Sequence, residues 1–240
     1  MRFSLKNYNG EWLDLENLLS KENKGLINDF FAKKSSWVSA VLDQINKFDI
    51  YKNFVNRDMD IFLDIGAHIG LVALYVATIA KKIYCFEPST DHFHVLKCLT
   101  ANFDNIITIQ AAISDRSGEE EFYESLINNT QNALIKHEPV RPLGKVKCYN
   151  LFNFLEENDI KNVDFVKIDV EGTEKDIILD ESFEKLNGRL FRIYVEVHNT
   201  APEPDNNFVF NQGLILRRLK ELRYKCSINN DAIFAEWIKN

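Results

Sequence analysis

Residues 61–88 alternate between strand-type and helix-type hydrophobic patterns, and this alternation constrains the fold more than any other feature. The segment IFLDIG at 61–66 predicts a strand, LVALYVATIAKK at 71–82 predicts a helix, and KIYCFEP at 82–88 predicts a second strand. Strands that alternate with helices form βαβ units, because parallel neighbours need a long crossover connection. The pattern therefore predicts an α/β fold with helices on both faces of a mostly parallel, doubly wound sheet.

The same alternation continues toward the C-terminus. A helix is predicted at 90–102, with Ser89 or Thr90 as its N-cap. Further predicted elements are a strand at 105–114, short strands EEFYES and KVKCYN, a helix LFNFLEEN, a strand VDFVKIDVEG, a helix at 174–180, a strand RLFRIYVEVH and a helix LILRRLKELRYK. The chain then ends in CSI–NND–AIFAEWI, which predicts an antiparallel hairpin because so short a loop cannot make a parallel crossover.

The N-terminal part has a different pattern. Residues 11–50 predict helices with short breaks, and one apolar stripe recurs at helical spacing, formed by Trp37, Val38, Val41, Leu42 and Ile45. We therefore expect two parts, a helical extension at 1–59 and the α/β domain at 60–240. The extension could serve as a lid, as an interface in a homodimer, or both, although packing within one chain explains the stripe equally well.

Composition narrows the classes of protein to consider. The net charge of −7 argues against a broad nucleic-acid surface, which needs clustered Lys and Arg. The longest apolar run, GLVALYVATIA at 70–80, is too short to span a membrane, and the N-terminus lacks the apolar core of a signal peptide. The cysteines at 85, 98, 148 and 226 have no C-x-x-C spacing. We expect a cytoplasmic protein that binds neither nucleic acid nor membrane.

The turn after the first predicted strand indicates a ligand. It reads Asp64-Ile-Gly66-Ala67-His68-Ile-Gly70, which differs from the dinucleotide loop G-x-G-x-x-G by having no glycine where a pyrophosphate would lie on bare backbone. A nicotinamide dehydrogenase is therefore disfavoured. Glu87, before Pro88 and about 20 residues past the turn, is placed to bind ribose hydroxyls. S-adenosylmethionine has a ribose and no pyrophosphate, and it fits this pattern.

Two later strands end in ionisable residues. Asp169 and Glu171 flank Val170, and Glu196 and His198 flank Val197, so each pair points to one face of its strand. Each residue has a plain alternative: Asp64, Asp169 or Glu171 could cap a helix, Glu87 could be a solvated loop carboxylate, and His198 could be an ordinary surface histidine. Because ligands bind at the carboxyl ends of strands in open α/β sheets, their joint placement favours a site.

Five segments together resemble the FkbM family of S-adenosylmethionine-dependent methyltransferases, over roughly residues 60–225. They are FLDIGAHIG, YCFEP, AAISD with the following Gly118, VKIDVEGTE and YVEVH. The resemblance implies a Rossmann-like class I methyltransferase fold. It also implies that Asp64, Gly66 and the backbone of Ala67 and His68 face the methionine end of the cofactor, that Glu87 holds the ribose, that Ala112 borders the adenine, and that Asp169 lies near the sulfonium. Gly70 and Pro88 complete the expected cofactor site. His68 stands where the family more commonly has Asn.

Methyl transfer to a hydroxyl needs the donor methyl group to be aligned with the acceptor oxygen and the hydroxyl proton to be removed. We expect His198 to be the general base, with Glu196 orienting it and Asp169 as the second candidate. Asp169, Glu171 and Glu196 could alternatively hold Mg²⁺ with the acceptor, but the metal-free mechanism is preferred. The acceptor is expected under the loops 125–144 and 199–211.

Three functions remain open from the sequence. The first is O-methylation of a hydroxyl on a sugar or related small molecule, which the resemblance favours. The second is N-methylation or carboxyl methylation of a small metabolite on the same scaffold. The third is a catalytically silent binding module, against which the presence of Asp64, Glu87 and Asp169 counts.

Overall fold

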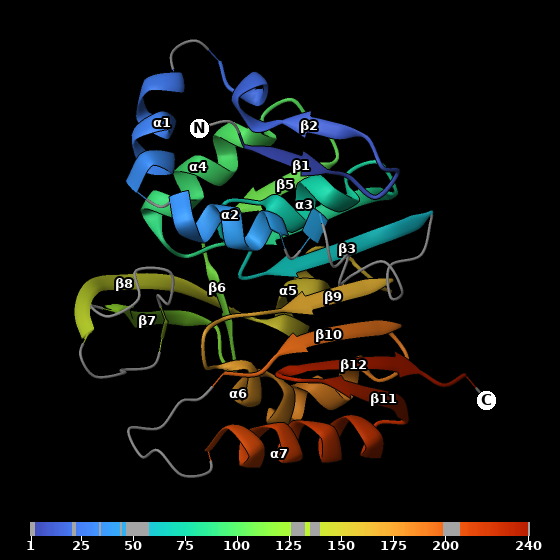
Figure 1. Ribbon diagram of the computed structural model, residues 1–240. Helices are drawn as coiled ribbons and strands as arrows, with labels where there is room; N and C mark the ends of the chain where they lie inside the picture. Colours follow the sequence, from blue (N-terminus) through green and yellow to red (C-terminus); the bar gives the residue numbers. More distant parts are fainter. Residues whose placement is uncertain are drawn as a thin grey trace. The chain divides into compact units, whose positions relative to one another are not determined.

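The structure is a computed structural model that describes residues 3–20, 23–33, 35–43, 45–46, 58–125, 133–134, 140–198 and 207–239. Contacts within the chain divide it into two compact units, residues 1–109 and 110–240. Figure 1 colours the chain from blue to red and labels the elements named below. Each unit is described by itself.

The first unit contains three parallel strands, β3 (Met59–Ile65), β4 (Ala80–Phe86) and β5 (Ile106–Ile109). Their register pairs Ile65 with Phe86 and Phe86 with Ile109, so the three carboxyl ends are level with one another. The helix α3 (Leu71–Val76) is entirely buried, and α4 (Thr90–Thr100) begins at the N-cap Ser89 as predicted. This arrangement places the ends of β3 and β4 side by side.

The N-terminal segment is not wholly helical. Strands β1 (Ser4–Lys6) and β2 (Trp12–Asp14) form an antiparallel pair, followed by η1 (Leu15–Leu18), α1 (Lys24–Lys33) and α2 (Ser35–Asp43). The expectation of helices throughout 11–50 is therefore wrong at β2, because strand pairing overrides the local pattern there. The stripe is confirmed at Val38, Leu42 and Ile45, which are buried. The division of the chain at residues 59 and 60 stays a prediction.

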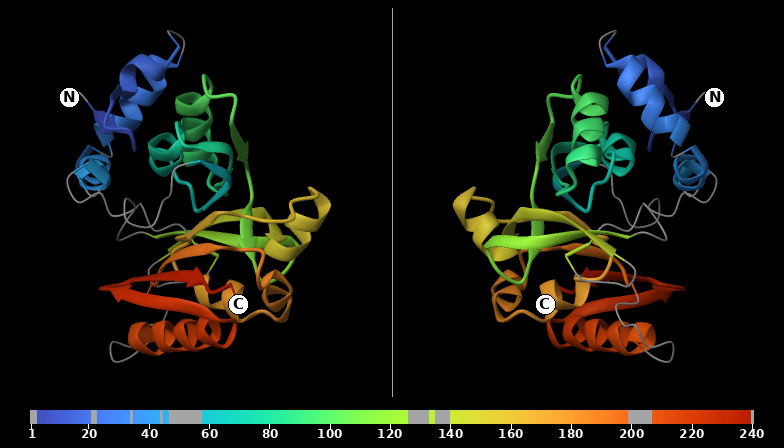
Figure 2. Two further views of the ribbon diagram at one scale, coloured as in Figure 1. Left: turned by 90° about the vertical axis from the view of Figure 1, so that its right-hand side faces the viewer. Right: turned by 90° about the vertical axis from the view of Figure 1, so that its left-hand side faces the viewer.

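The second unit has a sheet in the order β11-β12-β10-β9. β9 (Phe165–Ile168) and β10 (Arg192–Glu196) are parallel, whereas β12 (Ala232–Trp237) is antiparallel to both β10 and β11 (Tyr224–Asn229). The predicted terminal hairpin is thus confirmed, and Figure 2 shows it in red beside the long helix α7 (Asn207–Glu221). The remaining elements are β6 (Ala112–Ser114), β7 (Gly118–Ser125), β8 (Val140–Asn150), α5 (Leu151–Glu157), α6 (Glu174–Leu179) and η3 (Glu181–Leu186).

Two predicted elements have different bounds in the structure. The helix expected at 71–82 ends at Val76, and β4 already begins at Ala80, where Lys81 pairs with Asp60 of β3 at 2.6 Å. The strand expected at 105–114 is two strands, because β6 pairs with β8 in a separate sheet with β7. The α/β fold class with mostly parallel strands and a C-terminal antiparallel hairpin is nevertheless confirmed. Among the described residues, no helix has the length and apolar character of a membrane span.

Candidate functional site

The turn between β3 and α3, residues 66–70, is called the glycine turn below. Gly66, His68 and Gly70 have φ values of 77°, 51° and 85°, all in the left-handed region that glycine adopts easily and that histidine tolerates better than most residues. The amides of Gly66 and Ala67 both donate to the carbonyl of Phe86, at 3.0 and 2.9 Å. The glycine turn is therefore attached to the end of β4, directly before Glu87.

Gly70 is required for packing. A Cβ atom at this position would lie 2.5 Å from Cδ1 of Leu96 and 3.3 Å from Cγ2 of Thr100, both on α4. A contact of Gly70 with a cofactor stays a prediction. The close approach of α3 to α4 already accounts for a glycine at this position.

Glu87 is a buried carboxylate with a defined orientation. Its side chain accepts hydrogen bonds from the amide of His68 at Oε2 and from the amide of Ser89 at Oε1, both at 2.9 Å, and the residue is 5% exposed. This burial excludes the alternative of a solvated loop carboxylate. Because an ionised carboxylate has about four acceptor positions, two remain for other donors such as ribose hydroxyls. The following Pro88 leads into the N-cap of α4.

A second histidine adjoins this carboxylate. The rings of His68 and His92 lie 3.9 Å apart between centroids, and Nδ1 of the buried His92 is 3.8 Å from Oε1 of Glu87. The ring of Phe30, from α1, meets His92 edge-on at 6.0 Å. The sequence analysis missed His92, although its position three residues after the N-cap Ser89 could have placed it near Glu87.

The ends of β9 and β10 bring together all four predicted catalytic residues and one more. Nε2 of His198 lies 3.4 Å from Oε2 of Glu171, 3.8 Å from Oδ1 of Asp169 and 4.0 Å from Oε1 of Glu196. Nδ1 of His198 is 2.8 Å from Oε1 of Glu174. These five residues, Asp169, Glu171, Glu174, Glu196 and His198, are called the acidic–histidine cluster below.

Glu174 is the member that the sequence analysis missed. It is 1% exposed, and its Oε1 also accepts hydrogen bonds from the amides of Val170 and Gly172, both at 3.1 Å. Glu171 and Gly172 have φ values of 59° and 129°, which allow the chain to curve around this oxygen. Glu174 is the last residue of the VKIDVEGTE segment and the first residue of α6, and that position was the available signal.

The helix-cap alternatives are wrong. The N-cap of α3 is Gly70 and the N-cap of α6 is Thr173, so Asp64, Asp169 and Glu171 do not occupy these positions. Asp64 is instead fully buried near the end of β3.

Charge crowding shifts the proton affinities of the cluster. The charge of Asp169, followed by burial, raises the pKa of Glu196 to about 7. Burial raises the pKa of Glu171 to about 8, although the positive charge of His198 acts to lower it. Burial by itself would lower the pKa of His198, but the hydrogen bond and charge of Glu174, with the other carboxylates, raise it to about 10. The neighbouring carboxylates therefore favour the protonated imidazole, which must lose a proton before it can accept one or bind a cation through Nε2.

Three members of the cluster are arranged so that they could hold a cation. Asp169, Glu196 and His198 each offer one ligand atom, and these atoms all lie within 4.8 Å of one another. The set differs from the Asp169, Glu171 and Glu196 set considered for Mg²⁺, because the imidazole takes the place of Glu171.

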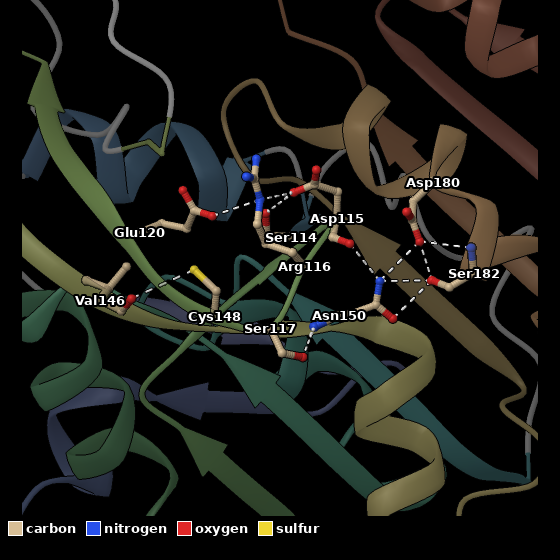
Figure 3. A network of polar contacts seen from close by, with 10 residues as sticks. All are labelled: Ser114, Asp115, Arg116, Ser117, Glu120, Val146, Cys148, Asn150, Asp180 and Ser182. Atoms are coloured by element: carbon tan, nitrogen blue, oxygen red, sulfur yellow. Dashed lines mark hydrogen bonds and ion pairs between the residues drawn. The ribbon is translucent and has the colours of Figure 1, made fainter.

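Ala112 lies in a region held by a polar network, shown in Figure 3. Ala112 is buried in β6 and pairs with Cys148 of β8. At the end of β8, Nδ2 of Asn150 lies 2.9 Å from the carbonyl of Asp115, 3.1 Å from Oδ1 of Asp180 and 2.8 Å from Oγ of Ser182. The network connects the segment after β6 to η3. The contact of Ala112 with adenine stays a prediction, and most of the two loops expected to cover the acceptor lies outside the described residues.

Comparisons with known proteins place the chain in a family. The model of the methyltransferase FkbM domain matches residues 64–226, more than half of the chain. The 2-O-methyltransferase NoeI of Sinorhizobium fredii is 27% identical over 49% of this chain and 56% of its own length. The hexuronic acid methyltransferase AglP of Haloferax volcanii is 26% identical over 68% of this chain and 66% of its own length. The chain thus spans less than two thirds of either relative.

A solved structure of the methyltransferase FkbM from Methylobacillus flagellatus is 12% identical, with 93% of this chain and 57% of that chain covered and a TM-score of 0.47. The match over residues 64–226 includes the glycine turn, Glu87 and the whole acidic–histidine cluster, and by this match the chain belongs to the FkbM methyltransferase domain family.

Proposed function

We propose that the chain is an S-adenosylmethionine-dependent methyltransferase that methylates a hydroxyl group of a saccharide or a related small molecule. The observation that carries this proposal is the environment of Glu87. A buried carboxylate at the end of the second parallel strand, oriented by the glycine turn, is where Rossmann-type sites bind a ribose. The glycine turn has Ala67 and His68 where a pyrophosphate would need bare backbone.

The residues of the first unit fit a nucleoside with an amino-acid side chain. Glu87 would hold the ribose hydroxyls with its remaining acceptor positions. The amides of Ala67 and His68 already donate within the unit, to Phe86 and Glu87, so the turn would contact the methionine end through other atoms. The bound sulfonium would supply the activated methyl group. The protein would align this group with the acceptor and exclude water.

The acidic–histidine cluster is the proposed acceptor site. A hydroxyl acceptor must lose a proton as the new C–O bond forms, and the cluster provides carboxylates and an imidazole to receive it. His198 and Asp169 remain the candidates for that step, with Glu171 and Glu196 beside them. AglP is named for its action on a hexuronic acid, a sugar acid, and NoeI for 2-O-methylation. The name of NoeI supports oxygen over nitrogen as the methylated atom, and the name of AglP supports a sugar acid as the acceptor.

Two measurements test the proposal. Calorimetry should detect binding of S-adenosylmethionine and of its demethylated product, whereas NAD should not bind. Mass spectrometry should then find one added methyl group on a member of a panel of hexoses, hexuronic acids and matched amino sugars, and NMR should place it on a hydroxyl oxygen. A methyl ester would favour carboxyl methylation instead. Methylation of nitrogen would favour the N-methyltransferase, and cofactor binding without turnover on any acceptor would favour the silent binding module. Absence of cofactor binding would overturn the proposal.

A further inference from the structure

We infer that Asp169, Glu196 and His198 form a binding site for one divalent cation, Mn²⁺ or Mg²⁺. Only the role given below to the acceptor rests on the proposed function; the site itself is argued from the second unit alone.

Each of the three residues has one polar atom held by a neighbour and a second atom directed toward a common point. Glu174 holds Nδ1 of His198 at 2.8 Å, and Lys167 lies 3.1 Å from Oδ2 of Asp169. The hydroxyl of Tyr194 donates to Oε2 of Glu196 at 3.1 Å. The second atoms, Nε2, Oδ1 and Oε1, are the ones that converge. Fixed outer partners that orient inner ligands are typical of metal sites in proteins.

The spacing of the converging atoms suits an ion. Nε2 of His198 is 3.8 Å from Oδ1 of Asp169 and 4.0 Å from Oε1 of Glu196, and one ligand atom from each of the three residues lies within 4.8 Å of the other two. These separations exceed the roughly 2.7–3.2 Å of an N–H···O hydrogen bond. An octahedral ion with ligands at about 2.1 Å separates adjacent ligands by about 3.0 Å and opposite ones by about 4.2 Å. Small side-chain movements would bring the three atoms to such positions.

The ligand types and their surroundings favour Mn²⁺ or Mg²⁺ within the divalent cations. Two carboxylates with one imidazole are harder ligands than the thiolates that select Zn²⁺ or copper. The groups facing the site include the carboxylates of Glu171 and Glu174 and the ammonium of Lys167, so the carboxylates of the cluster outnumber the basic groups around the three ligands. A cation would offset this charge.

The site leaves room for a further ligand. The side chains of His198, Asp169 and Glu196 are 17%, 25% and 30% exposed, so the common point is not closed off by its ligands. Three protein ligands leave about three positions of an octahedral ion for water or for an acceptor. If the proposed function holds, the acceptor hydroxyl would take one of these positions, and coordination would ease the loss of its proton. Glu171, the neighbouring carboxylate that is not a ligand of the ion, would receive that proton.

The test is direct binding of the metal to the full chain, without cofactor or acceptor. After removal of metals with EDTA, Mn²⁺ titration followed by electron paramagnetic resonance should give one bound ion per chain, and calorimetry should give the same for Mg²⁺. Asp169→Asn and Glu196→Gln should each weaken binding at least about tenfold. The matched controls Asp159→Asn and Glu236→Gln change exposed carboxylates outside the cluster and should leave binding unchanged.

Glu174→Gln tests whether Glu174 orients the imidazole of His198 for binding the ion. It should weaken Mn²⁺ binding by about tenfold, because His198 would lose the acceptor that fixes its ring. Because Glu174 is buried, circular dichroism must first show that this variant is folded. If the variant is unfolded, the test depends on the variants of Asp169 and Glu196, which are partly exposed.

Two outcomes overturn the inference: no saturable binding of either ion up to millimolar concentration, or binding that both cluster variants retain. Bound Mn²⁺ with no methyl transfer would support the site while counting against the proposed function. Methyl transfer in the presence of EDTA, by a protein that binds no metal, would support the proposed function and count against the metal site.

Discussion

Two regions place carboxylates at the ends of parallel strands: the glycine turn with Glu87, and the acidic–histidine cluster. The two regions differ in the groups that bind these carboxylates. Glu87 is held by the backbone amides of His68 and Ser89, so one charge meets two fixed dipoles. In the cluster, carboxylates face one another around a single imidazole, and the pKa values of Glu171 and Glu196 are raised to about 8 and about 7. A carboxylate satisfied by backbone amides suits stable binding of a neutral donor, whereas crowded carboxylates suit a cation or a proton transfer.

Under the proposed function the two regions have separate tasks. Changes in the first should alter cofactor affinity, and changes in the second should alter turnover.

The largest effect is expected from His198→Gln. Removing the imidazole from the cluster should lower turnover on the order of 1,000-fold, because the cluster loses the group proposed either to take the proton or to hold the cation that eases its loss. Affinity for S-adenosylmethionine should stay within about threefold, less than 1 kcal/mol. Steady-state kinetics and calorimetry on the same preparation check this. If turnover survives while affinity collapses, the assignment of tasks is reversed.

Glu87→Ala should produce the complementary result. Loss of hydrogen bonds from a buried carboxylate to ribose should weaken cofactor binding by about 100-fold, or about 2.7 kcal/mol. Glu87→Gln, which keeps one acceptor oxygen, should cost less. The control Asp91→Ala removes an exposed carboxylate from the first turn of α4. Calorimetry that gives wild-type affinity for Glu87→Ala would remove Glu87 from the ribose role.

Gly70→Ala tests whether packing alone supports the glycine turn. The added methyl group would meet Leu96 and impose an L-residue at a φ of 85°, so the free energy of unfolding should fall by about 2 kcal/mol. Gly213→Ala is the matched control, because its Cβ would meet open space among the described residues of α7. That change should raise the free energy of unfolding by about 0.5–1 kcal/mol. Urea unfolding measures both, and equal effects would contradict the packing argument.

The smallest effect is expected from His68→Asn. Glu87 binds the backbone amide of His68, and Asn adopts the left-handed conformation readily. Cofactor affinity measured by calorimetry should therefore change by less than about threefold. A loss as large as that of Glu87→Ala would show that the imidazole of His68, which lies against the ring of His92, is itself part of the cofactor site.

The fold was predictable where local chemistry and tertiary environment agree. Ser89 caps α4 as its residue type predicts, and Asn230, with a φ of 52°, makes the turn of the terminal hairpin. The prediction failed where pairing with distant residues decides. Trp12–Asp14 is a strand because it pairs with Ser4–Lys6, and Ala112–Ser114 leaves the preceding strand to pair with β8.

The sequence by itself determined which chemical groups stand at the strand ends: Glu87 after one strand, and Asp169, Glu171, Glu196 and His198 after two others. Because side chains alternate between the two faces of a strand, the sequence shows which of these residues share a face. Only the tertiary structure decided how His198 and Glu87 are satisfied, because their partners come from other elements. Glu174 of α6 orients His198, and the backbone of His68 in the glycine turn holds Glu87. Lys167 and Tyr194 hold the outer oxygens of Asp169 and Glu196 from two residues earlier in the chain. Hydrogen bonds and ion pairs depend on distances of a few ångströms, and folding sets those distances between residues that are far apart in the chain.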